Sequence, residues 1–108
     1  MTKFTIKTTN RFDRHLATLD KRLGLNFDEI MSVIEEIKVA KDILKEFGTL
    51  PQEYVYYLHR LEDEPWAGFM EFHVADDVLV VYADVTAKHE IRLVGIYNHE
   101  RLRQGKLD

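Results

Sequence analysis

The spacing of apolar residues changes near Pro51, and this change constrains the fold more than any other feature of the sequence. Before Pro51 the apolar residues recur three and four positions apart, as on one side of a helix. After it, β-branched and aromatic residues fill short runs separated by turn residues, as in strands. Helices followed by consecutive strands predict an α+β domain, in which the helices bury their apolar sides against an antiparallel sheet.

The first predicted helix begins at Asn10, whose side chain is expected to cap it. It ends at Gly24, where a left-handed residue is needed. Its apolar positions are spaced by four, three and four residues: Phe12, Leu16, Leu19 and Leu23. This spacing gives the helix one apolar and one charged side.

The second predicted helix begins at Asn26, which forms a capping box with Glu29, and ends at Phe47 before Gly48. The link from Gly24 is so short that the two helices form an antiparallel hairpin. The apolar residues expected on the buried side of the second helix are Phe27, Ile30, Ile34, Ile37, Leu44 and Phe47.

Strands are predicted at residues 3–8, 54–61, 66–74, 78–85 and 90–98, with a short C-terminal helical turn at 99–103. The short links after Pro51 indicate an antiparallel meander of three or four strands. Residues 78–82 show no polar alternation, which predicts a central strand covered on both faces. The order is β-α-α-β-β-β(-β), in one two-layer α+β domain spanning residues 1–108.

Composition limits the possible functions. A chain of 108 residues suits one domain, and the absence of cysteine excludes disulfides and thiolate metal sites. No apolar run approaches the ~18 residues that span a bilayer, so we expect a cytoplasmic protein, neither exported nor inserted in a membrane. The net charge of −4 counts against nucleic-acid binding, which usually rests on Lys and Arg.

Three histidines, His59, His73 and His99, fall near predicted strand ends in acidic surroundings. Glu71 shares a strand face with His73, on the side expected to be open, and Asp77 follows the next turn, where it can orient His73. Histidine exchanges protons near neutral pH, so the cluster suggests acid–base chemistry. A structural role is the alternative. No pair has the short spacing of a zinc site, so no metal is expected.

The other two histidines are expected to be solvated. His15 lies on the charged side of the first predicted helix, and His89 lies in a turn.

Several of these positions occur together in a recognisable order. They are His59, the turn Trp66-Ala67-Gly68, Glu71, His73, Asp77 and His99. In this order the second half of the chain resembles the YafQ branch of the RelE toxin family, part of the RelE/ParE superfamily. The strand-helix-helix-meander order of the whole chain agrees with that fold.

The resemblance implies the toxin of a type II toxin–antitoxin system, a ribosome-dependent endoribonuclease that cleaves mRNA without metal or cofactor and inhibits translation. Carried over by position, His59, Glu71, His73, Asp77 and His99 form the site. His99 is the expected general acid and either His59 or His73 the base, oriented by the two carboxylates. The implied partners are a cognate antitoxin, the ribosome and mRNA, with operator DNA bound through the antitoxin.

The sequence departs from the family pattern at three positions. Gly95 stands where the branch has an arginine, Val78 follows Asp77 where an aromatic residue is common, and Arg103 replaces another aromatic residue. Arg92 is not expected to replace the arginine simply, because an odd separation from Gly95 points it to the opposite face of a strand. The cations expected to contact RNA phosphates are Arg60, Lys88, Arg92, Arg101 and Arg103.

Two further functions remain open. One is a non-catalytic toxin that binds gyrase, like the ParE relatives, and the other is a degenerate toxin that only binds its antitoxin. The three clustered histidines favour the enzyme, whereas the missing arginine favours the alternatives. In every case, the antitoxin is expected to cover an apolar side of the helical hairpin or an edge of the sheet.

Overall fold

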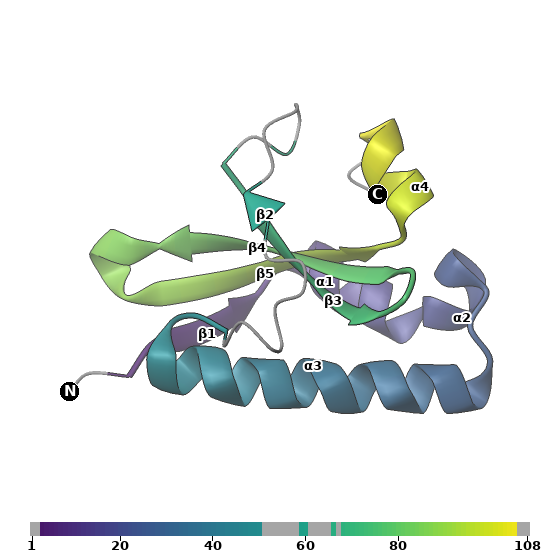
Figure 1. The fold of residues 1–108 in the computed structure, drawn as a ribbon, viewed down its shortest axis with the longest axis horizontal. Helices are drawn as coiled ribbons and strands as arrows, with labels where there is room; N and C mark the ends of the chain where they lie inside the picture. Colours follow the sequence, from purple (N-terminus) through teal and green to yellow (C-terminus); the bar gives the residue numbers. More distant parts are fainter. Residues whose placement is uncertain (1–2, 51–58, 61–65, 67, 106–108) are drawn as a thin grey trace.

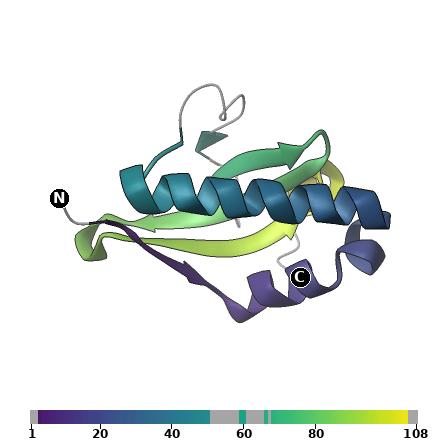
Figure 2. The ribbon, with the colours of Figure 1, turned by 90° about the horizontal axis from the view of Figure 1, so that it is seen from below.

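A computed structural model describes residues 3–50, 59–60, 66 and 68–105, and it has two layers. Figure 1 shows a twisted sheet, and Figure 2 shows α1 and α3 packed on one side of it. The elements in chain order are β1 (Thr5–Thr8), α1 (Asn10–Ala17), α2 (Leu19–Leu23), α3 (Phe27–Phe47), β2 (His59–Arg60), β3 (Met70–Ala75), β4 (Val78–Val85), the 3₁₀ turn η1 (Thr86–Lys88), β5 (Glu90–Tyr97) and α4 (His99–Gln104). The predicted α+β class is confirmed.

The described part of the sheet has the strand order β1-β5-β4-β3-β2. Strands β2 to β5 form the predicted antiparallel meander. The N-terminal strand joins the same sheet at its edge and runs parallel to β5. The sheet is therefore mixed rather than purely antiparallel. Of the strand predicted at 54–61, only β2 lies within the described residues.

The first helical segment is divided into two, which the sequence pattern did not predict. Helix α1 ends at Ala17, and its C-cap is Thr18, whose hydroxyl donates to the carbonyl oxygen of Arg14 at 2.7 Å. Helix α2 begins at the next residue, Leu19. The cap of α1 is Thr9 and not Asn10, because the Thr9 hydroxyl accepts from the Phe12 N–H at 3.0 Å. The predicted end at Gly24 is confirmed, with φ at 69°.

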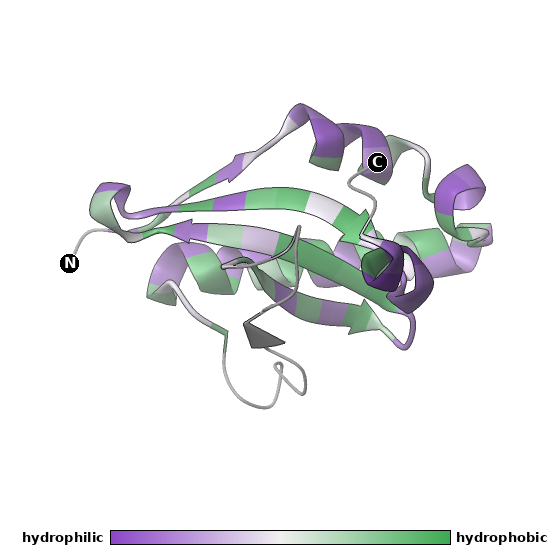
Figure 3. Cartoon of the chain, turned by 90° about the horizontal axis from the view of Figure 1, so that it is seen from above, coloured by the Kyte–Doolittle hydropathy of each residue, from purple (hydrophilic) through white to green (hydrophobic). Residues whose placement is uncertain are grey.

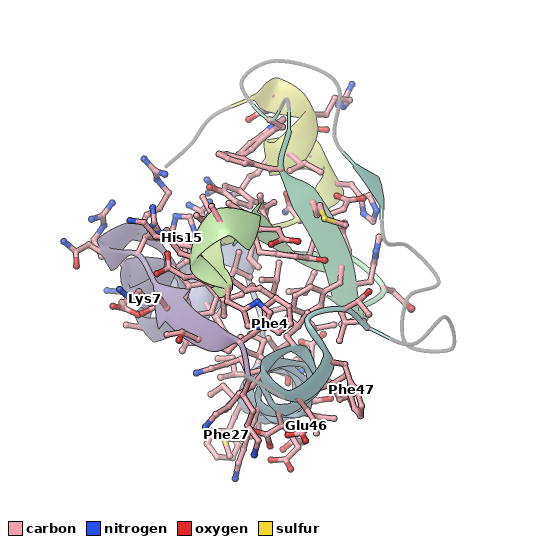
Figure 4. All side chains as sticks on the ribbon, turned by 90° about the vertical axis from the view of Figure 1, so that its left-hand side faces the viewer. Phe4, Lys7, His15, Phe27, Glu46 and Phe47 are labelled. Carbon is pink, nitrogen blue, oxygen red and sulfur yellow. The ribbon has the colours of Figure 1, made fainter. Side chains whose placement is uncertain are left out.

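Helix α3 has the predicted capping box and ends at Gly48, which has a φ of 74°. Its buried side was only partly predicted. Ile37 and Leu44 are buried as expected, together with Val33 and Ala40. Three residues expected on that side are exposed instead: Phe27 (74%), Ile34 (38%) and Phe47 (68%). In Figure 4 the Phe27 side chain lies below α3 and the Phe47 side chain lies beside it, at different positions around the helix.

Strand β4 lies in the centre of the sheet and is covered on both faces, as predicted. Its first five residues, Val78 to Tyr82, are all buried. The main core lies between the sheet and the helices, and a smaller cluster on the other face contains Trp66, Val81, Val94 and Tyr97. Figure 3 shows the apolar residues concentrated in the strands.

Helix α4 adjoins the smaller cluster. Leu102 packs against it, and the Trp66 ring N–H donates to the Leu102 carbonyl oxygen at 2.8 Å. This contact holds α4 next to the end of β5. Among the described residues, no helix is both long and apolar enough to cross a membrane.

Candidate functional site

The turn between β3 and β4 meets the junction of β5 and α4, and this meeting brings Asp77 to His99. The Asp77 carboxylate accepts from the His99 backbone N–H at 3.0 Å and lies 2.5 Å from the His99 Nδ1. Asn98 caps α4 by accepting from the Arg101 N–H, so the first turn of this helix fixes the His99 backbone. One carboxylate therefore holds both the main chain and the ring of His99.

His73 completes a chain of three side chains. Its Nε2 lies 3.1 Å from the His99 Nε2, and the two ring centroids are 5.1 Å apart. In the sheet, His73 is in register with Leu79, and Leu79 is in register with Tyr97. His99 follows Tyr97 by two residues, so the fold brings it back over this row toward His73.

The electrostatics of this site keep Asp77 ionised. The His99 backbone N–H, followed by the His99 ring, lowers the pKa of the Asp77 carboxyl below its usual range. An ionised Asp77 accepts a hydrogen bond from the Nδ1–H of His99, and the His99 Nε2 faces His73. About half of each side chain or more is exposed, at 57% for His99 and 65% for Asp77, so substrate can reach the pair.

Glu71 is placed differently from the sequence expectation. We expected its strand face to be open, but only 6% of Glu71 is exposed. Glu71 is in register with His59 on β2 and with Val81 on β4, and Val81 is in register with Gly95. His59, Glu71 and Gly95, the position of the implied arginine, thus lie in one row across the sheet. The His59 side chain lies outside the described residues, so its role stays a prediction.

At Gly95, where the resemblance implies an arginine, the Tyr97 side chain takes the space that a Cβ atom would need. A Cβ atom on Gly95 would lie 2.6 Å from the Tyr97 hydroxyl and 2.7 Å from a ring carbon. Tyr97 is fully buried, and its ring packs edge-on against Trp66 with centroids 4.9 Å apart. Replacing Gly95 with a larger residue therefore requires the Tyr97 ring to move.

The expected orientation of Arg92 was wrong, because β5 contains a bulge. Val81 pairs with Gly95 but Tyr82 pairs with Leu93, so one residue of β5 is extra. The bulge reverses the alternation and puts Arg92 on the same face as Gly95. Arg92 nevertheless pairs with Glu90 at 2.6 Å. Strand geometry places it roughly 20 Å along the chain from His99.

The remaining predicted cations divide between the two ends of the molecule. Lys88 lies in η1, and Figure 1 shows the β4–β5 turn and α4 at opposite ends of the long axis. Arg101 and Arg103 lie on α4 near His99, where Arg103 pairs with Glu100. Arg60 lies in β2, and its side chain is outside the described residues.

His15 is the residue that the sequence analysis misplaced most. It is only 4% exposed, and its Nδ1 accepts from the Ile96 N–H at 2.9 Å. Arg22 donates from Nε to the Ile96 carbonyl oxygen, also at 2.9 Å. These two side chains satisfy the edge of β5 beyond the last residue of β1. Nothing in the single sequence signals this, because His15 lies among charged residues.

Burial, and after it the positive charges of the nearby arginine side chains with Arg22 first, lower the pKa of His15 to about 4. His15 is therefore neutral at pH 7. His89 lies in a turn as predicted, with a φ of 53°, but its ring stacks on Phe4 at 3.8 Å and is only partly exposed.

No three His, Asp or Glu side chains within residues 3–50, 59–60, 66 and 68–105 are grouped to hold a metal ion. The site itself contains two imidazoles and a carboxylate in one chain of contacts, His73–His99–Asp77. Such a chain can take a proton from one substrate oxygen and give a proton to another.

Comparison with known proteins places the chain in a family. Residues 4–104 match the family described as the bacterial toxin of the type II toxin–antitoxin system, YafQ. None of the curated proteins matches. Escherichia coli YafQ has a similar structure, with a TM-score of 0.65 and 22% identity over 93% of this chain and 98% of that one.

Two other solved structures share the fold. A metal-bound toxin from Helicobacter pylori has a TM-score of 0.60 and 25% identity, over 92% of this chain and 98% of that one. The toxin chain in the Escherichia coli DinJ–YafQ toxin–antitoxin complex has a TM-score of 0.64 and 22% identity, over 93% and 97%. Because the family match spans nearly the whole described chain, this protein belongs to the YafQ family of type II toxin–antitoxin toxins.

Proposed function

We propose that this YafQ-family toxin is a ribosome-dependent endoribonuclease that cuts mRNA by metal-independent acid–base catalysis and so inhibits translation. The observation that carries the proposal is the chain His73–His99–Asp77, with contacts of 3.1 Å and 2.5 Å. Cleavage of RNA by its own 2′-hydroxyl needs a base, an acid and a cation near the phosphate. The three side chains His73, His99 and Asp77 supply the base and the acid.

In the proposed reaction, His73 or His59 removes the proton of the ribose 2′-hydroxyl. The resulting oxygen forms a bond to phosphorus, and the bond from phosphorus to the 5′ oxygen breaks. His99 gives its proton to that departing oxygen. The products are a 2′,3′-cyclic phosphate and a free 5′-hydroxyl, so the step consumes no water.

Asp77 is the proposed positioning residue for His99. By accepting a hydrogen bond from Nδ1–H, Asp77 directs Nε2 toward the substrate. Its negative charge also stabilises the charged imidazolium that gives a proton to the departing oxygen. After cleavage, the base holds an extra proton and His99 lacks one. The direct contact between the Nε2 atoms of His73 and His99 offers a route to return it.

The proposed partners follow from the family. The Escherichia coli relative has been solved in a complex with the antitoxin DinJ, and we propose that this toxin likewise binds a cognate antitoxin. The apolar residues exposed on α3, Phe27, Met31 and Ile34, are one candidate seat for an antitoxin helix. The proposed assembly also binds operator DNA through the antitoxin.

The test compares growth arrest and mRNA 5′ ends after induced expression of the wild type, His99→Ala, His73→Ala and Asp77→Asn. We expect cuts inside codons on ribosome-bound mRNA, and a loss of about 10²-fold or more in cutting for His99→Ala. His89→Ala is the control, because His89 lies in the turn at the far end of the molecule. Arrest with no cuts, equal in all variants, would contradict the nuclease and point to a gyrase-binding toxin.

A second candidate is a toxin fold that binds its antitoxin but no longer cuts RNA. The observation that favours it is the Tyr97 ring in the space of the family arginine. This candidate predicts neither arrest nor cuts from the wild type, together with full binding of the antitoxin.

A further inference from the structure

Four arginines from three helices surround one buried histidine at the end of the molecule that holds His99. Arg11 and Arg14 lie on α1, Arg22 on α2 and Arg101 on α4. Arg14 and Arg22 line the same open cavity as His15, and Arg101 donates to the Arg22 carbonyl oxygen. The charges of all four arginines lower the pKa of His15. Figure 1 shows α2 and α4 toward the same end of the sheet.

Hydrogen bonds hold two of these arginines in place. Arg22 donates to the Ile96 carbonyl oxygen, and its guanidinium lies 5.0 Å from the centre of the Tyr97 ring. Arg101 donates from Nε to the Arg22 carbonyl oxygen at 3.2 Å. These bonds connect α4 to α2, so the charges are positioned before any ligand arrives.

Arg11, Arg14 and Arg101 have no ion pair with a carboxylate in the described part of the chain. Within the same residues, the Nε of Arg11 is buried and has no hydrogen-bond partner. Leaving a buried charged donor without a partner costs free energy, so the charge of Arg11 is not offset by a bond within the described residues. In a chain with a net charge of −4, this concentration of positive charge is local.

The cluster borders an open cavity of about 430 Å³ lined by Arg14, His15, Ala17, Thr18 and Arg22. Its described lining contains two guanidinium groups, one hydroxyl and a neutral imidazole, and no carboxylate. Guanidinium groups match phosphate oxygens in geometry as well as charge. The cavity therefore has the chemistry of a phosphate site.

We propose that this arginine cluster, Arg11, Arg14, Arg22 and Arg101, binds phosphodiester groups of RNA. The inference rests on the proposed function, because it assigns the cluster the task of holding RNA beside His99. Arg101 lies on α4, the helix that begins at His99, and its bond to the Arg22 carbonyl oxygen joins this helix to the cluster. The bound phosphates belong either to the mRNA that is cut or to the surrounding ribosomal RNA.

The expected effect follows from counterion release. Each phosphate neutralised on a single strand contributes about −0.7 to the slope of log K against log salt. Replacing two arginines should reduce the magnitude of this slope by about 1.4. It should also weaken binding by about tenfold or more near 100 mM salt.

The experiment measures RNA binding in a His99→Ala background, which prevents cleavage. The test variant adds Arg11→Gln and Arg14→Gln, because neither side chain is bonded to β5. The matched control adds Lys38→Gln and Lys45→Gln, which remove the same charge from the exposed side of α3. One arm uses a labelled single-stranded RNA of 20 nucleotides, and the other uses purified ribosomes.

We expect the test variant to lose affinity and salt dependence while the α3 control keeps both. A loss of affinity for the single-stranded RNA assigns the bound phosphates to mRNA. A loss of affinity for ribosomes alone assigns them to ribosomal RNA. The variant with Arg11→Lys and Arg14→Lys in place of the two glutamines should keep most of the affinity. Equal melting temperatures of the test variant and the α3 control exclude misfolding as the cause of a loss.

Equal losses in the test variant and the α3 control, or none in either arm, would overturn the proposal. So would unchanged RNA binding with weaker binding of the antitoxin, which would assign the cluster to an acidic peptide. The measurement does not depend on catalysis. If the wild type makes no cuts, the proposed function is rejected, whereas the measured binding of RNA by the arginine cluster is unaffected.

Discussion

Acidification should destabilise this protein through His15, well before most carboxylates titrate. His15 is buried and neutral, and its Nδ1 accepts from the Ile96 N–H. Protonation would remove that acceptor and place a positive charge among arginines. Because the pKa of His15 falls from an ordinary 6.5 to about 4 on folding, the unfolded chain binds the proton more tightly. Stability is therefore highest above pH 6.5 and is lost as the pH falls toward 4.

The size of the effect follows from the two pKa values. A difference of about 2.5 units corresponds to about 3 kcal/mol at its limit. Most of this loss falls between pH 6.5 and 4, with about 2 kcal/mol already lost at pH 5. Such a loss is a large share of the 5–15 kcal/mol that typically stabilises a domain.

The assay is urea unfolding between pH 7.5 and 4.5, followed by the fluorescence of Trp66, the single tryptophan, which is buried. His15→Asn is the comparison variant, because its amide oxygen can replace Nδ1 as acceptor but does not titrate. Asp77 also has a lowered pKa, so its contribution is lost in the same direction, but it is common to both proteins. The reasoning is refuted if the two stability curves run parallel from pH 7.5 to 5.

Three other substitutions test the packing around the site. Gly95→Arg should lower the melting temperature, because its Cβ would meet the Tyr97 ring; a melting temperature equal to that of the wild type would contradict this. Asn26→Ala should cost about 1 kcal/mol in urea unfolding through the loss of the α3 cap, whereas Asn26→Ser should cost little. Trp66→Phe should cost about 1 kcal/mol or more, measured by circular dichroism, because it leaves the Leu102 carbonyl without its donor.

The positions of most elements followed from local sequence. Gly24 and Gly48 end helices with a positive φ, and the capping box at Asn26 begins α3. These signals act within one turn of a helix, so a single sequence contains them completely. Thr9 was missed as the cap of α1 because Asn10, beside it, is an equally good capping residue.

Features that depend on contacts between distant residues were less predictable. Phe27 and Phe47 fit a helical apolar pattern yet are exposed, since the side of α3 that the sheet covers is set by packing. The bulge in β5 changed the face of Arg92, because one extra residue reverses the alternation of side chains.

The sequence by itself determined the α+β class, the order of elements and the set of polar positions that resembles the toxin family. Tertiary structure decided which of those positions meet. It joined Asp77 to His99 and His73 to His99, buried Glu71, and brought the His15 ring to the Ile96 N–H. The physical reason is range: caps and periodicity act over a few residues, whereas these three contacts join groups 22 to 81 residues apart in the chain, which only the packing of the sheet and helices brings together.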